Sequence, residues 1–256
     1  MTSSAFSFTM QGFDLHFRKA ALVHREWLTE SYVRVRLRGD ELLGFESLGC
    51  DDHVRVFFPD GNPDTIEQLR AAPSREYTPV AWADDWLELE FAVHGDSGVA
   101  AQWAAKAPLG SIAGVGGPRG SKVLEGSPDA WFLAGDETAL PAIRRFAQLM
   151  SATATGRIIL EVTDAAHEMV IEVPEGVTVE QVHRGDTPPS TALIARLDEL
   201  TVDDRPNNDV LGFIAAEQSV VKPGRALLLD RWGLDADSVI VKGYWKRGDT
   251  EYHAPH

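Results

Sequence analysis

The chain is poor in the residues that build metal and redox centres. Among its 256 residues there is one cysteine, Cys50, so neither an intramolecular disulfide nor a four-cysteine iron–sulfur or zinc site can be made from this chain. Its eight histidines show no metal-binding spacing. No Ser–His–Asp set or cysteine nucleophile motif can be argued either. Any redox chemistry therefore needs an organic cofactor, and we expect no catalytic side chain and no metal held by the protein.

Positive charge and long apolar runs are scarce as well. Lys and Arg number 24 against 39 Asp and Glu, which gives a net charge of -15 without a run of basic residues. Such a chain repels phosphate backbones and anionic surfaces, so we expect no nucleic-acid partner. No apolar stretch approaches the ~18 residues of a membrane span, and no basic segment with a long apolar run opens the chain. The sequence predicts a soluble cytoplasmic protein without membrane insertion.

Short β-type runs dominate the first half of the chain. Several of them alternate apolar and polar residues, as half-buried strands do. One helix is predicted between Gly98 and Ala107, where Pro108 ends it. Six or so short antiparallel strands with one helix indicate a small closed β-barrel. The runs are 21–23, 32–37, 54–58, 77–80, 86–93 and 111–115.

Strands and helices alternate in the second half, after a turn at Gly126. This alternation predicts a parallel sheet covered by helices, an α/β domain. We therefore expect two domains, a β-barrel at 1–126 and an α/β domain at 127–256. The expected strands are 130–134, 157–162, 178–182, 210–215 and 238–241, and the expected helices are 140–150, 191–200 and 223–232.

Five motifs follow one another along the chain, and the last places cations beside aromatic residues. They are Arg75-Glu76-Tyr77-Thr78, His94-Gly95-Asp96-Ser97-Gly98-Val99-Ala100, Gly117-Pro118-Arg119-Gly120-Ser121, Gly135-Asp136-Glu137-Thr138-Ala139 and Gly243-Tyr244-Trp245-Lys246-Arg247-Gly248. In this order and spacing the chain resembles the siderophore-interacting protein family, flavin-dependent ferric-siderophore reductases related to the ferredoxin reductases. The resemblance implies an FAD-binding β-barrel followed by an NAD(P)H-binding α/β domain.

The resemblance assigns the first motif to FAD. Its chemistry suits that role, because the Tyr77 ring can pack on an isoalloxazine face and the Thr78 hydroxyl can bond the ring edge. The Arg75 guanidinium can pair with the pyrophosphate in a bidentate manner.

The second and third motifs are implied to complete the FAD site. The strand-to-helix turn can point backbone amides at a phosphate, and it carries Val99 where the family usually has proline. The residues assigned to this cradle are His94, Gly95, Ser97, Gly98, Val99 and Ala100. Trp103, on the following helix, either contacts adenine or packs in the core. In the loop of Arg119, Gly120 and Ser121, the arginine either reaches phosphate or caps the domain junction.

The fourth motif is implied to face the nicotinamide nucleotide, through Gly135, Asp136, Glu137 and Thr138. Two carboxylates disfavour a pyrophosphate, so NADPH, NADH and a ferredoxin all remain candidate electron donors. His183-Arg184 either grips a 2′-phosphate or lies in a solvated loop. Glu217 lies near flavin or substrate, or, more simply, interacts with a helix start.

The fifth motif is implied to receive the substrate. Lys242, Lys246 and Arg247 can attract a ferric siderophore, which usually carries negative charge. Trp245 either stacks on flavin or packs in the core. The predicted function is FAD-dependent reduction of ferric siderophores, with NADPH or NADH as donor and iron as cargo. Two alternatives remain, a ferredoxin-fed flavin reductase and a non-catalytic ferric-siderophore binding protein.

Overall fold

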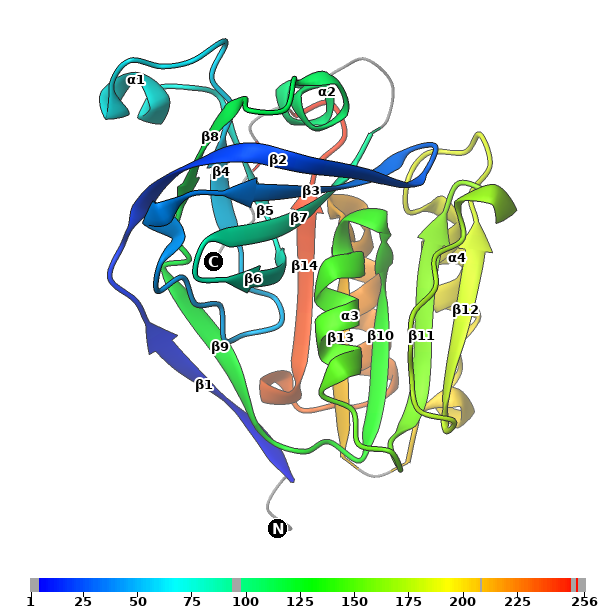
Figure 1. Cartoon of the computed structure of the whole chain (residues 1–256). Helices are drawn as coiled ribbons and strands as arrows, with labels where there is room; N and C mark the ends of the chain where they lie inside the picture. The colour runs from blue at the N-terminus through cyan, green and yellow to red at the C-terminus, as the bar shows by residue number, and fades with distance from the viewer. Residues whose placement is uncertain (1–4, 94–97, 208, 250–251, 253–256) are drawn as a thin grey trace. The chain divides into compact units, whose positions relative to one another are not determined.

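The computed structural model describes residues 5–93, 98–207, 209–249 and 252 (Figure 1). Residues 10–123 form one compact unit, and a second comprises residues from Leu124 onward together with the described residues up to Thr9. Strands β1 (Phe6–Gly12) and β9 (Gly120–Gly126) pair in a two-stranded sheet, and the division runs through both strands. No helix in the described ranges is long and apolar enough to cross a membrane.

The first unit is a curled antiparallel sheet of seven strands, in the order β5-β4-β8-β2-β3-β7-β6 (Figure 1). The predicted antiparallel β-domain is confirmed, but the sheet is a half-barrel with β5 and β6 as edge strands and not the closed barrel that was expected. Its strands are β2 (Phe17–Thr29), β3 (Tyr32–Arg38), β4 (Val54–Phe57), β5 (Ser74–Tyr77), β6 (Pro79–Ala83), β7 (Trp86–Ala92) and β8 (Ile112–Gly116), and its helices are α1 (Ile66–Arg70) and α2 (Val99–Lys106).

Alternation along the strands places apolar side chains in the core of this unit and charges on the other face. On β3, Val33, Val35 and Leu37 are fully buried. The residues between them form cross-strand ion pairs with β7, since Arg34 contacts Glu90 at 2.6 Å and Arg36 contacts Glu88 at 2.7 Å. Such pairs stabilise one strand register over its neighbours.

The second unit contains a five-stranded parallel sheet in the order β12-β11-β10-β13-β14, which confirms the predicted α/β architecture. Helix α3 covers one face of the sheet, and α4 and α5 cover the other (Figure 1). The strands are β10 (Ala130–Asp136), β11 (Thr155–Val162), β12 (Val177–His183), β13 (Val210–Glu217) and β14 (Val239–Trp245). The helices are α3 (Leu140–Gln148), α4 (Thr191–Glu199) and α5 (Val221–Arg225), which a π-helix at Ala226–Arg231 continues.

Single-turn 3₁₀ helices lie at many strand and loop ends. They span Asp40–Leu42, Glu137–Ala139, Ala165–His167, Val202–Asp204, Gln218–Val220 and Ala236–Ser238. Four of them begin at an Asp or Glu whose side chain accepts a hydrogen bond from a backbone amide of the first turn, as an N-cap residue does. Short acidic turns of this kind account for part of the excess of carboxylates in the chain.

Several elements differ from the sequence prediction. Strands β1 and β9 and helix α1 were not expected, and the run expected at 77–80 is divided between β5 and β6. Strand β14 runs on to Trp245, four residues beyond the predicted end at Val241, so the first half of the fifth motif is strand. Gly243 allows this extension, because a Cβ there would collide with the Gln218 side chain. The helix predicted from Pro223 begins two residues earlier, at Val221, since proline is tolerated in the first turn of a helix.

Candidate functional site

The flavin motif lies at the edge strand of the half-barrel. Arg75 and Tyr77 are on β5, and Thr78 separates β5 from β6. The Tyr77 ring packs on Phe91 with their centroids 4.1 Å apart, which leaves it half-buried. Burial raises the pKa of Tyr77, against the opposing charge of Arg75, so its hydroxyl stays protonated at neutral pH. This residue presents a neutral aromatic surface supported by the core.

Arg75 and Thr78 retain unused hydrogen-bonding capacity. The guanidinium of Arg75 donates through Nη1 to the Ser74 carbonyl at 2.6 Å, and within the described residues this is its one side-chain hydrogen bond. Thr78 is 8% exposed, and no hydrogen bond joins its side chain to any described residue. A guanidinium with spare donors, a hydroxyl without a partner among the described residues and a neutral ring fit the pyrophosphate and ring system of FAD.

The structure describes part of the phosphate cradle that the family resemblance implies. Gly98 is the N-cap of α2 and has φ 104, and no side chain of a described residue caps the helix, so among these residues the amides of Val99 and Ala100 have no acceptor. His94, Gly95 and Ser97 lie outside the described residues. Trp103 is 9% exposed and its ring lies 5.3 Å from that of Phe58, which places it in the core of the half-barrel.

The loop at 117–121 mixes one exposed residue with buried ones. Arg119 is exposed. Ser121 is fully buried, donates to Asp52 Oδ2 and accepts from the Leu48 amide at 3.1 Å. Gly120 packs so closely on Gln11 that a Cβ would lie 2.9 Å from its carbonyl oxygen. Ser121 and Gly120 therefore hold the loop in place, and Arg119 is the member of the predicted set that a ligand can reach.

Asp136, at the end of β10, has all its acceptor capacity in use. Its Oδ1 accepts from the Thr138 amide at 2.9 Å and from the Thr138 hydroxyl. Its Oδ2 accepts from the Glu217 amide at 3.1 Å and from Trp245 Nε1 at 2.9 Å. The carboxylate thus links the ends of β10, β13 and β14. Gly135 beside it is needed for packing, because a Cβ would lie 2.5 Å from the Ala215 carbonyl oxygen.

Glu137 differs from its neighbour. It is 5% exposed, its Oε1 has no hydrogen-bond partner among the described residues, and Arg184 Nη1 lies 3.9 Å away. Burial, followed by the nearby charge of Asp136, raises the pKa of Glu137 to about 7, although Arg184 opposes this. Arg184 also donates to Thr163 Oγ1 at 2.7 Å, while His183 bonds Glu168 at 2.9 Å. Arg184 is therefore an internal partner and not a free anion site.

Glu217 fastens the segment that follows β14. Its Oε2 accepts from the Ser219 amide at 2.7 Å, which confirms the helix-start interaction, and its Oε1 accepts from the Arg247 amide at 3.1 Å. Burial alone would raise the pKa of Glu217, but these hydrogen bonds outweigh it and lower the pKa. A β-bulge between Ala216 and Glu217 shifts the register so that Trp245 lies opposite Glu217.

The predicted substrate cations lie along and beyond β14. Lys242 is half-exposed within the strand, whereas Lys246 and Arg247 are exposed after its end. Across the described part of the chain, no ion pair engages the side chain of Lys246 or Arg247. These two residues form the basic turn, an exposed pair of cations that an anion can approach.

Comparison with known proteins identifies the chain. Residues 21–122 match the family model of the siderophore-interacting FAD-binding domain, and residues 128–248 match that of the siderophore-interacting protein. The chain belongs to the siderophore-interacting protein family. It is 30% identical to the ferric vibriobactin reductase ViuB of Vibrio cholerae over 250 residues, covering 90% of each chain. It is 31% identical to an NADPH-dependent ferric-chelate reductase of Escherichia coli, covering 91% of this chain and 94% of that one.

A solved structure supports the same assignment. A siderophore utilization protein from T. fusca superposes with a TM-score of 0.84 at 30% identity, covering 96% of this chain and 98% of that one. The half-barrel and the parallel sheet of this siderophore-interacting protein are therefore the two domains of the family fold.

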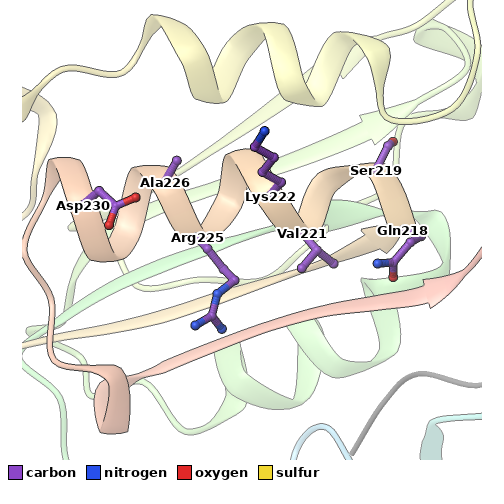
Figure 2. A pocket seen from close by; sticks show the side chains of 7 residues that line it. All are labelled: Gln218, Ser219, Val221, Lys222, Arg225, Ala226 and Asp230. Carbon is purple, nitrogen blue, oxygen red and sulfur yellow. The ribbon is translucent and has the colours of Figure 1, made fainter.

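A shallow pocket runs along α5 of this siderophore-interacting protein, apart from the residues that the sequence singled out (Figure 2). Figure 2 shows Lys222 and Ser219 pointing to one side of the helix and Arg225 and Val221 to the other. The lining residues are Gln218, Ser219, Val221, Lys222, Arg225, Ala226 and Asp230. Side chains that diverge in this way do not converge on a ligand, so the pocket adds nothing to the candidate site.

Proposed function

We propose that this siderophore-interacting protein is a cytoplasmic, FAD-dependent reductase of ferric siderophores that draws electrons from NADPH or NADH. The observation that carries the substrate assignment is the basic turn, whose two exposed cations lack ion-pair partners among the described residues of a chain with a net charge of -15. The reductases of V. cholerae and E. coli named above support the reaction class.

The half-barrel supplies the flavin site in this proposal. Arg75 binds the pyrophosphate with its free donors, Tyr77 covers the ring system, and Thr78 bonds the ring edge. The amides of Val99 and Ala100 and the side chain of Arg119 complete the phosphate contacts. When bound, FAD accepts the two electrons of a hydride and passes them on singly, so one NAD(P)H reduces two ferric ions.

The basic turn binds the chelate. Lys246 and Arg247, with Lys242 on the preceding strand, attract an anionic ferric siderophore within about one Debye length, ~8 to 10 Å. Trp245, whose indole N–H is anchored, offers an aromatic surface beside these cations. Reduction to ferrous iron weakens its hold by oxygen-donor ligands, so product release needs no acid or base from the protein.

In this proposal the electron donor binds at the carboxyl ends of β10 and β13. The strand order of the parallel sheet reverses between these two strands, and open α/β sheets bind ligands at such a point. A reduced ferredoxin is the second candidate. The loop at 135–138 is a weak site for a pyrophosphate, because Glu137 is acidic and the Thr138 amide already donates to Asp136. A weak pyrophosphate site disfavours a nicotinamide nucleotide and so favours the ferredoxin.

Anaerobic stopped-flow absorbance of purified protein loaded with FAD tests the function. We expect NADPH or NADH to bleach the flavin bands, and a ferric tris-catecholate added with a ferrous chelator to restore them while ferrous complex forms. Bleaching by a reduced ferredoxin and not by nicotinamide nucleotides would select the second donor. Failure to bind FAD would replace the reductase with a ferric-siderophore binding protein.

A further inference from the structure

One hydrogen-bond network joins the fourth motif to the fifth. Asp136 Oδ2 accepts from Trp245 Nε1 at 2.9 Å, across a sequence separation of 109 residues. The same oxygen accepts from the Glu217 amide at 3.1 Å. Glu217 in turn holds the Arg247 amide at 3.1 Å. The network therefore fixes both the indole and the backbone of the basic turn.

The burial and hydrogen bonds of Asp136 argue against its binding a ligand directly. The residue is 2% exposed, and its two oxygens receive four donors from Thr138, Glu217 and Trp245. A carboxylate with its acceptors occupied gains little from a further donor, and losing it strands buried N–H groups. The position of Asp136 in the sequence suggested a nucleotide contact, but its contacts are those of an internal anchor.

We propose that Asp136 is a positioning residue for the ferric-chelate site. It holds Trp245 directly and the Lys246–Arg247 backbone through Glu217, so that one aromatic face and two cations meet an anionic chelate together. This inference rests on the proposed function, because it assigns the chelate to the basic turn. It predicts that a change at Asp136 weakens chelate binding without any contact between Asp136 and the chelate.

The test measures binding separately from turnover. The gallium(III) complex of a tris-catecholate siderophore serves as a redox-inert anionic probe, and its Kd is determined by equilibrium dialysis against FAD-loaded protein. Trp245→Phe removes the indole N–H donor, together with part of the ring surface, and keeps an aromatic ring. Since one hydrogen bond is lost, we expect its Kd to rise about fivefold.

Changes at Asp136 itself distinguish anchoring from charge. Asp136→Ala removes the acceptor, and we expect its Kd to rise about tenfold or more. Asp136→Asn loses the charge but can keep its carbonyl oxygen toward Trp245 and Glu217, so it should stay within about threefold of the wild type. In the Asp136→Ala, Trp245→Phe double variant the effects should not multiply, because both changes break the same bond.

Glu161→Ala is the matched control. Glu161 is also buried at the carboxyl edge of the sheet, and it accepts from the amides of Ser190 at 2.6 Å and Leu193 at 2.8 Å without a bond to Trp245. A Kd that rises equally in Glu161→Ala and Asp136→Ala would overturn the proposal, as would an unchanged Kd in Trp245→Phe. Wild-type protein that neither binds the gallium complex nor reduces the ferric one would instead refute the proposed function.

Discussion

Four buried carboxylates lie at the carboxyl ends of the described parallel strands, and their hydrogen-bond partners divide them into two kinds. Asp136, Glu161 and Glu217 each accept backbone amides with both oxygens in use. Glu137 has an Oε1 without a hydrogen-bond partner in the described structure. Its ion-pair partner Arg184 lies 3.9 Å away, and a buried carboxylate without a hydrogen bond on one oxygen is costly to ionise, so the protonation of Glu137 changes near neutral pH.

Stability should depend on pH through Glu137. Its pKa is about 7 in the folded protein and near 4.5 when unfolded, so the native state holds the proton over this interval while the unfolded state loses it. The contribution is therefore fully present below pH 4.5 and is lost as pH rises through 7, a change of about 3 kcal/mol. The Gln side chain of Glu137→Gln cannot ionise, so this variant does not lose that stability as the pH rises. We expect its urea midpoint to exceed that of the wild type at pH 8 and to match it near pH 4.5, whereas an equal difference at both pH values would contradict this account.

Arg75 should determine FAD affinity. Arg75→Ala removes a guanidinium with free donors, and a charge-assisted bidentate contact of this kind is worth about 1.5–3 kcal/mol. We expect the Kd for FAD, from flavin fluorescence during titration of apoprotein, to rise at least tenfold. The Kd of Arg75→Lys for FAD should lie between those of the wild type and Arg75→Ala. Arg38→Ala is the control, because Arg38 is an exposed arginine of the same unit paired with Asp85 at 3.1 Å. Equal losses in both alanine variants would remove Arg75 from the site.

At the scale of elements, the π-helix after α5 orients two side chains onto the end of α4. Arg231 Nη1 donates to the carbonyls of Leu197 at 3.1 Å and Leu200 at 2.6 Å. Trp232 Nε1 donates to the Thr201 carbonyl at 2.7 Å. The last carbonyls of a helix lack partners within it, so these donors stabilise α4. The wider turn of the π-helix thus joins the two helices on one face of the sheet.

Arg231→Ala should destabilise the parallel-sheet unit. The Leu200 carbonyl keeps no other hydrogen bond among the described residues, and leaving it unpaired costs about 1–3 kcal/mol in the free energy of unfolding, measured by urea denaturation. Arg225→Ala is the matched control, since Arg225 is exposed on the same helical segment and should change stability by less than about 0.5 kcal/mol. Similar losses in both variants would mean that the cap does not contribute.

Periodicity in the sequence was sufficient for most elements. Strands β3, β7, β10 and β13 were predicted because each has an alternating or continuous apolar pattern, which follows directly from its two faces. Helix α1 was missed although its capping box is legible, with Thr65 and Gln68 three residues apart. The full length of β14 could not be predicted, because it depends on the contact between Gly243 and Gln218 and on a bulge opposite Ala216 and Glu217.

At the scale of the whole molecule, the net charge of -15 opposes the local charge of the basic turn. Repulsion by the net charge acts over a longer distance than attraction by the basic turn, so salt screens the repulsion first. The Debye length falls from about 30 Å at 0.01 M salt to about 10 Å at 0.1 M. For a ferric tris-catecholate we therefore expect kcat/KM to rise over this interval, as long-range repulsion is screened, and to fall at higher salt. Lys246→Ala with Arg247→Ala should abolish the fall. A neutral ferric hydroxamate provides the control, and the same salt profile with that substrate would contradict the electrostatic explanation.

The sequence could predict only those parts of the candidate site whose residues lie in one short segment. Arg75, Tyr77 and Thr78 form one short motif, so their grouping needed no tertiary information. The bond between Asp136 and Trp245 joins residues on different strands, and the burial of Ser121 depends on Asp52. Such contacts depend on strand order and register, which the local pattern does not specify.

The Asp136 network also bears on how the protein is made. Synthesis delivers β10 first, yet Glu217 and Trp245, which complete the partners of Asp136, follow 81 and 109 residues later. Until they emerge from the ribosome, the central strand of the parallel sheet lacks one neighbour and its terminal carboxylate lacks two donors. All seven strands of the half-barrel sheet, by contrast, have been made once Gly116 is added. Nascent chains therefore pass through a stage in which every strand of the half-barrel sheet is present and the parallel sheet has an open edge at β10, and an unpaired edge of this kind is prone to aggregation.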